Sequence, residues 1–465
     1  MTPVHEPPVD PTEPAATPPA GGVPLQILQV IPDFGLGGIQ KAGCVVAEAM
    51  AEAGHRVFVA AAGDGPRFAG AGSRTFPGGG TLEHRLLGEE PEALRLLIEE
   101  LQPQIVHEHA AYVEGCGVLA PHAAGRSPQH GTWITPVFGR PPEDRSVLGR
   151  VNVCCVGVYT LYRLLRWLGR DPTRHRDRSI IGVPLTPFAP AGVGVSSLDP
   201  PEVLMRRRAG FGLPEGLQLV VGRQGRNSLG KWHPRTVQLV GGLLERNPGV
   251  GWLSIGMPEE VGAGALKARF GDRFQNRPET SDFHELAEVL AALDVQIFMS
   301  KHGECFASSI CETAGLAVPT IAFSSPLGDN GQAEQVIDGV TGHLVASEEQ
   351  CEARVRELMD PVTLTALKRS TREHCLTRWH VKRSAADLVD AYRDRLVPEG
   401  NPSDAFEAVA TEVAAFARGY RPRVLSLVPV GRERVKLRAA LLLAERWSTF
   451  RLGRAVKRRL RPAGR

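Results

Sequence analysis

The sequence predicts an α/β protein made of two successive doubly wound domains, each a parallel sheet with helices on both faces. Short apolar runs alternate with amphipathic stretches along most of the chain, which is typical of buried parallel strands joined by helices. The alternation stops in a Pro- and Gly-rich stretch between Pro184 and Pro214 and then restarts. A chain of 465 residues is also long enough for two or three domains.

The first half opens with the apolar run LQILQVI (25–31), followed by a Gly-rich loop and an amphipathic stretch. Gly54 ends that stretch, as expected of a residue that favours helix C-termini. The helical stretch that follows begins at Pro91 and stops before Pro103. Further strand-like runs are RVFVAAA (56–62), QIVHEH (104–109) and VNVCCVGV (151–158).

The second half repeats this alternation. Its strand-like runs are LQLVVG (217–222), GWLSIG (251–256), VQIFMS (295–300) and VPTIAF (318–323), with helical stretches between the first three. Open α/β sheets bind ligands at the carboxyl ends of their strands, so we expect a ligand site in a cleft between the two domains.

The composition fits an ordinary globular protein, and a net charge of +3 indicates no polyanionic partner for the whole chain. No apolar run approaches the roughly 20 residues of a membrane span. Residues 1–24 lack the basic start and apolar middle of a secretion signal, so we expect a disordered lead. The eight cysteines form no Cys-x-x-Cys pair, which favours reduced, buried thiols in a cytosolic protein.

Two acids lie eight positions apart in GECFASSICETAGLAVPTIAF (303–323). Glu304 follows a strand closely, and a brief helix ending at Gly315 would offer its first amides as an anion site. If both acids were helical, Glu304 and Glu312 would point about 80° apart and reach neighbouring parts of one ligand. The alternative is a capping box, in which Ser309 and Glu312 satisfy their own helix start; this segment alone favours that alternative.

Other candidates are weaker when each is taken alone. Arg223 and Lys231 follow a strand in VVGRQGRNSLGKWHP (220–234), where loop charges are common. His107 and His109 end a strand, and structural histidines are the more common outcome there. The glycine-rich loop does not complete a dinucleotide fingerprint, because Gln40 stands at the third glycine. No Asp-x-Asp metal pair occurs in the chain.

Several segments together resemble the retaining glycosyltransferases of family 4, which have the GT-B fold of two Rossmann-like domains facing a cleft. The resemblance covers about residues 25–396. Its segments are ILQVIPDFGLGGIQKAGCVVAEAMAEAGHRVFV (27–59), VVGRQGRNSLGKWHP, ECFASSICETAGLAVPTI, AEQVIDGVTGHLV (333–345) and RWHVKRSAADLVDAYRDRL (378–396). Motifs in this order are more specific than any one of them.

The resemblance implies a role for each matching residue. Glu304 would hold hydroxyls of the donor sugar, and Glu312 the ribose of the nucleotide. Arg223 and Lys231 would neutralise the diphosphate, where negative charge develops as the sugar leaves. Arg223, Lys231 and Glu304 thus form the expected catalytic set. The expected donor-binding residues are Gly37, Gly38, Phe306, Ala307, Ser308 and Glu312.

The chain departs from the family at three places. Ala307 stands where glycine is frequent, and the spacing from Arg223 to Lys231 is longer than usual. Phe138 stands where many members have a histidine. Phe138 is therefore grouped with His107 and His109 as the acceptor-side candidates.

The predicted organisation follows from these segments. The expected parts are a disordered lead (1–24), an acceptor domain (25–190), a linker (191–215), a donor domain (216–375), a closing helix that crosses back (376–396) and a basic C-terminal tail (397–465).

The predicted function is a metal-independent, retaining transfer of a hexose-type sugar from a UDP- or GDP-sugar. The acceptor, which the sequence does not identify, would be a small molecule, a glycan or a lipid-linked molecule. No cofactor and no nucleic-acid partner are expected, and the predicted location is the cytoplasm. The alternatives are a non-catalytic GT-B nucleotide-sugar-binding protein and a GT-B nucleotide-sugar epimerase.

The C-terminal end is strongly basic. Residues 431–465 hold 12 Lys or Arg and 2 Glu, a net charge of +10. A solvated tail is the usual explanation, and a helix on the anionic inner face of a membrane is the sharper one. On the second reading, a chain ending near Gly400 should keep its fold and lose binding to anionic vesicles.

Overall fold

The computed structural model describes residues 23–35, 37–65, 72–88, 91–111, 131–136, 148, 150–185, 194–280, 282–397 and 401–449. The described chain divides into two compact units. Unit 1 comprises residues 194–325 and 335–380. Unit 2 comprises the described residues before 186, residues 326–334 and those after 380. The segment 326–334 therefore belongs to unit 2, although the chain on both sides of it belongs to unit 1.

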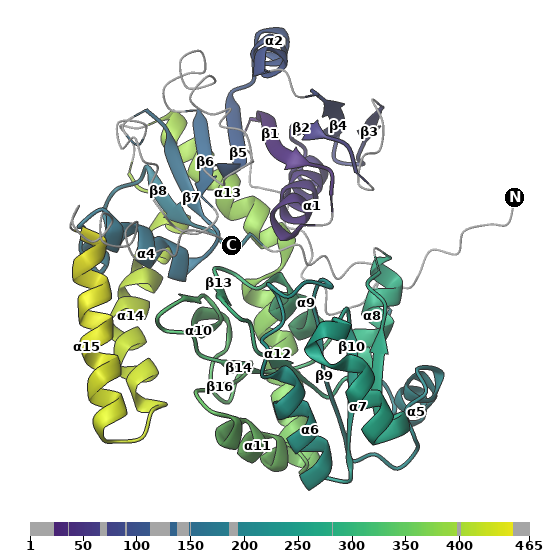
Figure 1. Ribbon diagram of the computed structural model, residues 1–465. Coiled ribbons are helices and arrows are strands. Elements are labelled where there is room, and N and C mark those ends of the chain that lie inside the picture. Colours follow the sequence, from purple (N-terminus) through teal and green to yellow (C-terminus); the bar gives the residue numbers. More distant parts are fainter. Residues whose placement is uncertain are drawn as a thin grey trace, which may run out of the picture. The chain divides into compact units, whose positions relative to one another are not determined.

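Unit 2 is built on an eight-stranded sheet in the order β3-β4-β2-β1-β5-β6-β7-β8 (Figure 1). All neighbouring strands are parallel except β3 and β4. The strands are β1 (Gln26–Asp33), β2 (Arg56–Gly63), β3 (Ser73–Thr75), β4 (Thr81–Leu86), β5 (Ile105–Ala111), β6 (Thr132–Pro136), β7 (Asn152–Cys155) and β8 (Ile180–Gly182); β15 (Asp329–Asn330) lies in the segment 326–334.

Helices cover both faces of this sheet. Leu28 and Val30 of β1 pack with Leu94 and Leu97 on one face, whereas Gln29 contacts helices on the other face. The helices are α1 (Gly38–Glu52), α2 (Pro91–Leu101), α4 (Val158–Trp167), α13 (Val381–Leu396), α14 (Asp404–Ser426) and α15 (Arg432–Thr449), with a 3-10 turn at Pro172–Arg174.

The segment 326–334 caps a helix of unit 2. The residue before α4 is Gly157, which has no side chain to accept the first amides of the helix. The Glu334 carboxylate accepts hydrogen bonds from the amides of Val158 (2.9 Å) and Tyr159 (2.7 Å) instead. It thus supplies the negative charge that favours a helix N-terminus.

Helix α14 is part of the core of unit 2. Val409 and Val413 are buried with apolar residues of β6, β7, β8 and α4, and the hydroxyl of Tyr420 accepts a hydrogen bond from Asn330 (3.0 Å). Removing everything after Gly400 would expose this core. We therefore expect such a chain to lose stability, in place of keeping its fold, because the predicted tail contains an element of the core.

Unit 1 has a six-stranded, all-parallel sheet in the order β11-β10-β9-β12-β14-β16. The strands of this sheet are β9 (Leu219–Gln224), β10 (Val250–Ile255), β11 (Phe274–Arg277), β12 (Val295–Phe298), β14 (Thr320–Phe323) and β16 (Gly342–Val345). Unit 1 also contains the short strand β13 (Gly303–Glu304), which lies outside this sheet. Its helices are α5 (Pro201–Gly210), α6 (Thr236–Arg246), α7 (Ala263–Phe270), α8 (Phe283–Ala291), α9 (Ser308–Gly315), α11 (Glu348–Glu357) and α12 (Pro361–Arg378), with 3-10 turns at Glu259–Val261 and Gly271–Arg273; α10 (Gln332–Gln335) ends in unit 1.

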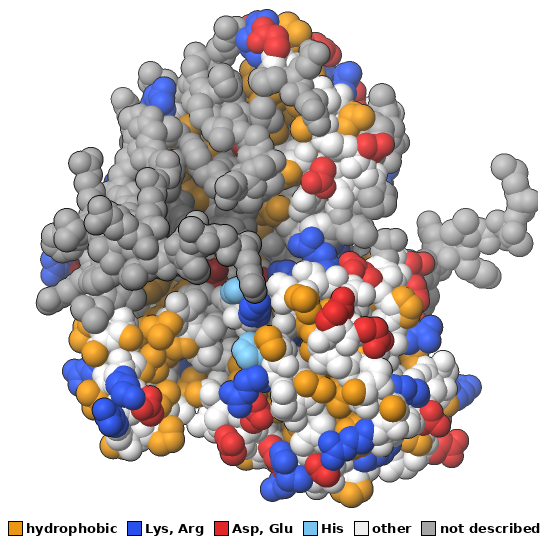
Figure 2. Space-filling view, in the orientation of Figure 1, with side chains coloured by type: hydrophobic (Ala, Val, Ile, Leu, Met, Phe, Trp, Pro, Cys, Tyr) orange, Lys and Arg blue, Asp and Glu red, His pale blue; other side chains and the backbone are white. Residues whose placement is uncertain are grey.

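Alternate residues of the unit 1 strands point to opposite faces and build two cores. Leu219 and Val221 pack with α6 and α11, whereas Val220 packs with α8 and with Leu316, which follows α9. Basic and acidic side chains are mixed over the face of unit 1 seen at the lower right of Figure 2. Among the helices of the described residues, none combines the length and apolar character needed to cross a bilayer.

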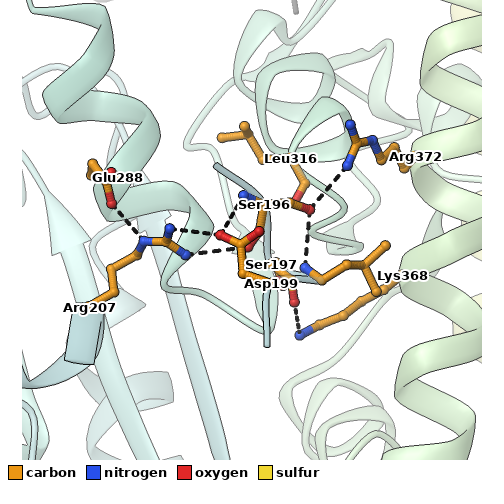
Figure 3. A network of polar contacts seen from close by, with 9 residues as sticks. Ser196, Ser197, Asp199, Arg207, Glu288, Leu316, Lys368 and Arg372 are labelled. Atoms are coloured by element: carbon orange, nitrogen blue, oxygen red, sulfur yellow. Dashed lines mark hydrogen bonds and ion pairs between the residues drawn. The ribbon is translucent and has the colours of Figure 1, made fainter. Parts of the chain in front are cut away.

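Part of the predicted linker is a fixed piece of unit 1 (Figure 3). The Ser197 amide donates to the Leu316 carbonyl (2.9 Å), and the Ser197 carbonyl accepts from the Lys368 ammonium (3.0 Å). Arg207 of α5 bridges Asp199 (2.8 Å) and Glu288 (2.6 Å). These contacts tie residues 196–199 to α5, α8, α12 and the end of α9.

Candidate active site

Arg223 lies at the carboxyl end of β9 and is almost fully buried. Its guanidinium lies against the rings of Trp232 and Phe298, 4.8 and 4.9 Å from their centroids. It donates to the carbonyls of Met299 and Lys231, the second at 2.6 Å. Burial lowers the pKa of Arg223 to about 10, against the opposing charge of Glu304, so Arg223 stays charged at neutral pH.

The loop after β9 has a fixed conformation that presents Lys231. The Trp232 indole is fully buried and donates to the Arg226 carbonyl (3.1 Å), and the Lys231 amide donates to the Ser228 carbonyl (3.0 Å). A Cβ atom on Gly225 would lie 3.1 Å from the Trp232 nitrogen, so a larger residue would press on the indole. Trp232 and Arg223 together therefore hold this loop.

The predicted cation and the first predicted acid meet at this loop. The Lys231 ammonium lies 2.7 Å from a carboxylate oxygen of Glu304, and the two side chains are 37% and 16% exposed. Gly303, just before Glu304, has a φ of +74°, which side chains other than glycine rarely adopt. This turn directs the acid toward Lys231.

The second acid lies inside α9. Glu312 is 6% exposed and accepts a hydrogen bond from the side-chain amide of Gln224 (2.6 Å). Helix α9 begins at Ser308, with Ala307 as its N-cap and no side-chain hydrogen bond at the cap. Ser309 therefore lies within the helix, and the capping-box alternative is wrong.

The turn between the two acids is held by Gln335. Its amide group accepts from the Ala307 amide (2.8 Å) and donates to the Ala307 carbonyl (2.9 Å). Ala307 has a φ of −86°, so alanine fits this turn without backbone strain. Phe306 packs on the buried Cys311 cluster, and Ser308 opens the helix half-buried.

The predicted glycines of the first half lie in unit 2. Gly37 is the N-cap of α1 and Gly38 is its first residue, with no acidic side chain in the first turn. Asp33 accepts from the Gly35 amide (2.6 Å) and from the Gln40 amide group (3.2 Å). The Gln40 side chain thus folds back over Gly37, where a Cβ atom would lie 2.0 Å from its oxygen.

His107 and His109 lie inside unit 2, with exposures of 0% and 2%. His107 contacts the hydroxyls of Tyr392 (2.6 Å) and Thr135 (2.7 Å), and His109 contacts the Gln29 amide oxygen (2.6 Å). Both imidazoles are therefore structural groups in the interior of unit 2, which is the alternative that the sequence left open. Phe138, the third acceptor-side candidate, lies outside the described residues.

Replacing His109 by glutamine is expected to flatten the dependence of stability on pH. Burial lowers the pKa of His109 to about 4, whereas the unfolded chain takes up this proton near pH 6.5. Stability is therefore full above about pH 6.5 and is lost as the pH falls toward 4, by about 2 kcal/mol at pH 5. Urea unfolding at pH 7 and pH 5 measures the difference. The exposed His302→Gln is the control, and an unchanged pH dependence in His109→Gln would contradict the expectation.

Within the described residues, no group of three or more His, Cys, Asp or Glu side chains is placed to hold a metal ion. Among the residues that the structure describes, unit 1 brings together four of the predicted site residues: Lys231 in contact with Glu304, Arg223 bonded to the Lys231 carbonyl, and Glu312 on the next helix. Gly37 and Gly38 lie in unit 2. Sequence reasoning missed Gln224, Trp232 and Gln335, which hold these groups in place.

No family model and no curated protein matches the chain, but solved structures do. A glycosyltransferase from Rickettsia africae ESF-5 has a TM-score of 0.60 at 14% identity, covering 80% of this chain and 99% of its own. HepE from Anabaena, in complex with UDP and glucose, has a TM-score of 0.59 at 14% identity, covering 79% of this chain and 100% of its own. Sucrose-phosphate synthase from Thermosynechococcus elongatus has a TM-score of 0.57 at 17% identity, covering 80% of this chain and 100% of its own.

These likenesses define the fold class. The two units are Rossmann-like, and the chain has the GT-B fold of glycosyltransferases.

Proposed function

We propose that the protein is a glycosyltransferase that uses a nucleotide-sugar donor. The observation that carries this proposal is the group at the carboxyl ends of β9 and β12: a cation, an acid on a turn, and a second acid on the next short helix. Solved proteins of the same fold include HepE in complexes with UDP-glucose and with UDP. The finer proposal is a family 4 enzyme that transfers a hexose-type sugar from UDP or GDP with retention of configuration.

Lys231 is the proposed partner of the donor diphosphate. When the bond between the sugar and the diphosphate breaks, negative charge grows on the leaving phosphate, and a fixed cation stabilises it there. Lys231 is the more exposed partner of its ion pair, so its ammonium can accept a second anion beside Glu304. Glu304, whose carboxylate lies beside the Lys231 ammonium, would then hold hydroxyls of the sugar.

Arg223 acts in this proposal through its neighbour. Its side chain is buried and donates to the carbonyl of Lys231. We therefore assign Arg223 as a positioning residue that fixes the Lys231 loop, in place of the direct diphosphate contact that the resemblance implies.

A donor screen tests the proposal. Thermal unfolding with UDP, GDP, ADP and their sugars should single out one nucleotide, because a ligand at 100 times its Kd adds about 2.7 kcal/mol of stability. Release of nucleotide from that sugar without acceptor should follow, and EDTA should leave it unchanged. Binding without release favours the non-catalytic alternative, and a changed sugar without release favours the epimerase. Stabilisation by none of the nucleotides contradicts the proposal.

The two acids should give different kinetic defects. Glu304→Gln removes the charge proposed to align the sugar, so kcat should fall with little change in nucleotide affinity. Glu312→Gln should instead weaken nucleotide-sugar binding, because Glu312 is proposed to hold the ribose. Steady-state kinetics and calorimetry of the free nucleotide separate the two effects. Equal losses that follow thermal stability alone would contradict both roles.

A further inference from the structure

The C-terminal helix α15 forms a hairpin with α14, and the two lie side by side (Figure 1). The Arg434 guanidinium donates to the Val428 carbonyl (2.6 Å), near the end of α14, and Leu441 is buried at 5% exposure. Arg434, Leu437 and Leu441 follow helical spacing, so they define the face of α15 that packs on α4 and α14. The hairpin is thus a fixed element, and the opposite face of α15 is presented outward.

The outward face carries an apolar stripe between cations. Val435, Ala439 and Leu442 follow each other at helical spacing and are all exposed, Val435 at 68% and Leu442 at 39%. Lys436 and Arg438 flank this stripe on either side. Figure 2 shows apolar side chains gathered over the α14–α15 hairpin at the lower left. An apolar stripe edged by long basic side chains is the composition of helices that lie in a membrane interface.

We propose that the outward face of α15 is a docking surface for a bilayer containing anionic lipid. The residues from 431 to 465 carry a net charge of +10, which complements such a surface. Valine and leucine side chains on the same face would enter the acyl boundary while the basic side chains reach the headgroups. Such docking would occur whether or not the protein has the proposed activity.

Vesicle flotation of the full-length chain tests this surface. Wild-type protein should float with vesicles of phosphatidylcholine mixed with phosphatidylglycerol, and not with phosphatidylcholine alone. Raised salt should weaken the binding, because the attraction acts within about 8 Å at physiological ionic strength. Each basic residue near an anionic surface contributes on the order of fivefold in affinity, so Arg432→Glu with Arg438→Glu should reduce binding about 25-fold or more.

Matched variants distinguish binding through this surface from an effect of the overall charge of the chain. Arg206→Glu with Arg369→Glu makes the same charge change at exposed residues of unit 1, and it should bind vesicles far more tightly than the α15 pair. Val435→Ser with Leu442→Ser keeps the charge and should also lose affinity. Thermal unfolding checks that every variant is folded. Equal binding by the two charge variants overturns the proposal, as does binding to duplex RNA in preference to anionic vesicles.

Discussion

Replacing Lys231 by alanine is expected to raise the activation barrier of donor cleavage by about 2–4 kcal/mol, the usual effect of removing one group that stabilises developing charge. The Lys231–Glu304 ion pair is partly exposed, so the loss of stability should stay below about 1 kcal/mol. Single-turnover cleavage of the donor, together with thermal unfolding, measures both effects.

The matched control is Lys267→Ala, which removes an exposed lysine of unit 1 that pairs with Asp272 (3.2 Å). It should leave the rate unchanged. If Lys231→Ala cleaved the donor at the wild-type rate, the diphosphate would have to be held by other residues, and the proposed role of this loop would be lost.

Replacing Asp294 by alanine is expected to destabilise unit 1 by about 3–5 kcal/mol, because it leaves buried cations without their counter-charge. Asp294 is 4% exposed and lies 2.7 Å from Lys368 and 2.8 Å from Arg208. It also accepts from the Val220 amide (2.8 Å). Urea unfolding near neutral pH measures the loss, and Asp272→Ala at an exposed ion pair is the control.

The same variant should show a defined pH dependence. Burial by itself raises the pKa of Asp294, but Lys368 and Arg208 outweigh it and hold the pKa below its usual value. The stability that this carboxylate contributes is thus present above about pH 4, the unfolded value, and is lost as the pH falls through the folded pKa. The gap between wild type and Asp294→Ala should therefore narrow only below about pH 4. A gap that already narrows between pH 7 and pH 5 would contradict this account.

Much of the fold could be predicted from the chain itself. Apolar runs of four to eight residues mark the parallel strands, and Gly54, with a φ of +95°, follows the end of α1 as expected. The C-terminal end was harder to predict. Its basic composition indicated a tail, whereas the apolar face of α14 packs on strands far away in the sequence. Periodicity can predict that such a helix is amphipathic, but it does not say what the helix covers.

The candidate site, like the fold, could be predicted from the sequence only in part. Lys231, Glu304 and Glu312 could be named because their residue types and spacing match known chemistry. Gln224 and Gln335 could not, because each acts through a hydrogen bond to a partner 88 or 28 positions away. His107 contacts the Tyr392 hydroxyl 285 positions away, and local sequence does not reveal such a partner.

The capping of α4 by Glu334 limits which segments of this protein can be replaced by those of another protein. Recombination that replaced residues 188–380 as one cassette would also replace the segment 326–334, which belongs to unit 2. The chimera would keep the amides of Val158 and Tyr159 from the N-terminal parent. The carboxylate that they bind would have to come from the other parent's residue at position 334. Chimeras of this kind should be viable mainly when this nine-residue segment stays with the N-terminal parent, so lineages that shuffle such halves should inherit it together with α4.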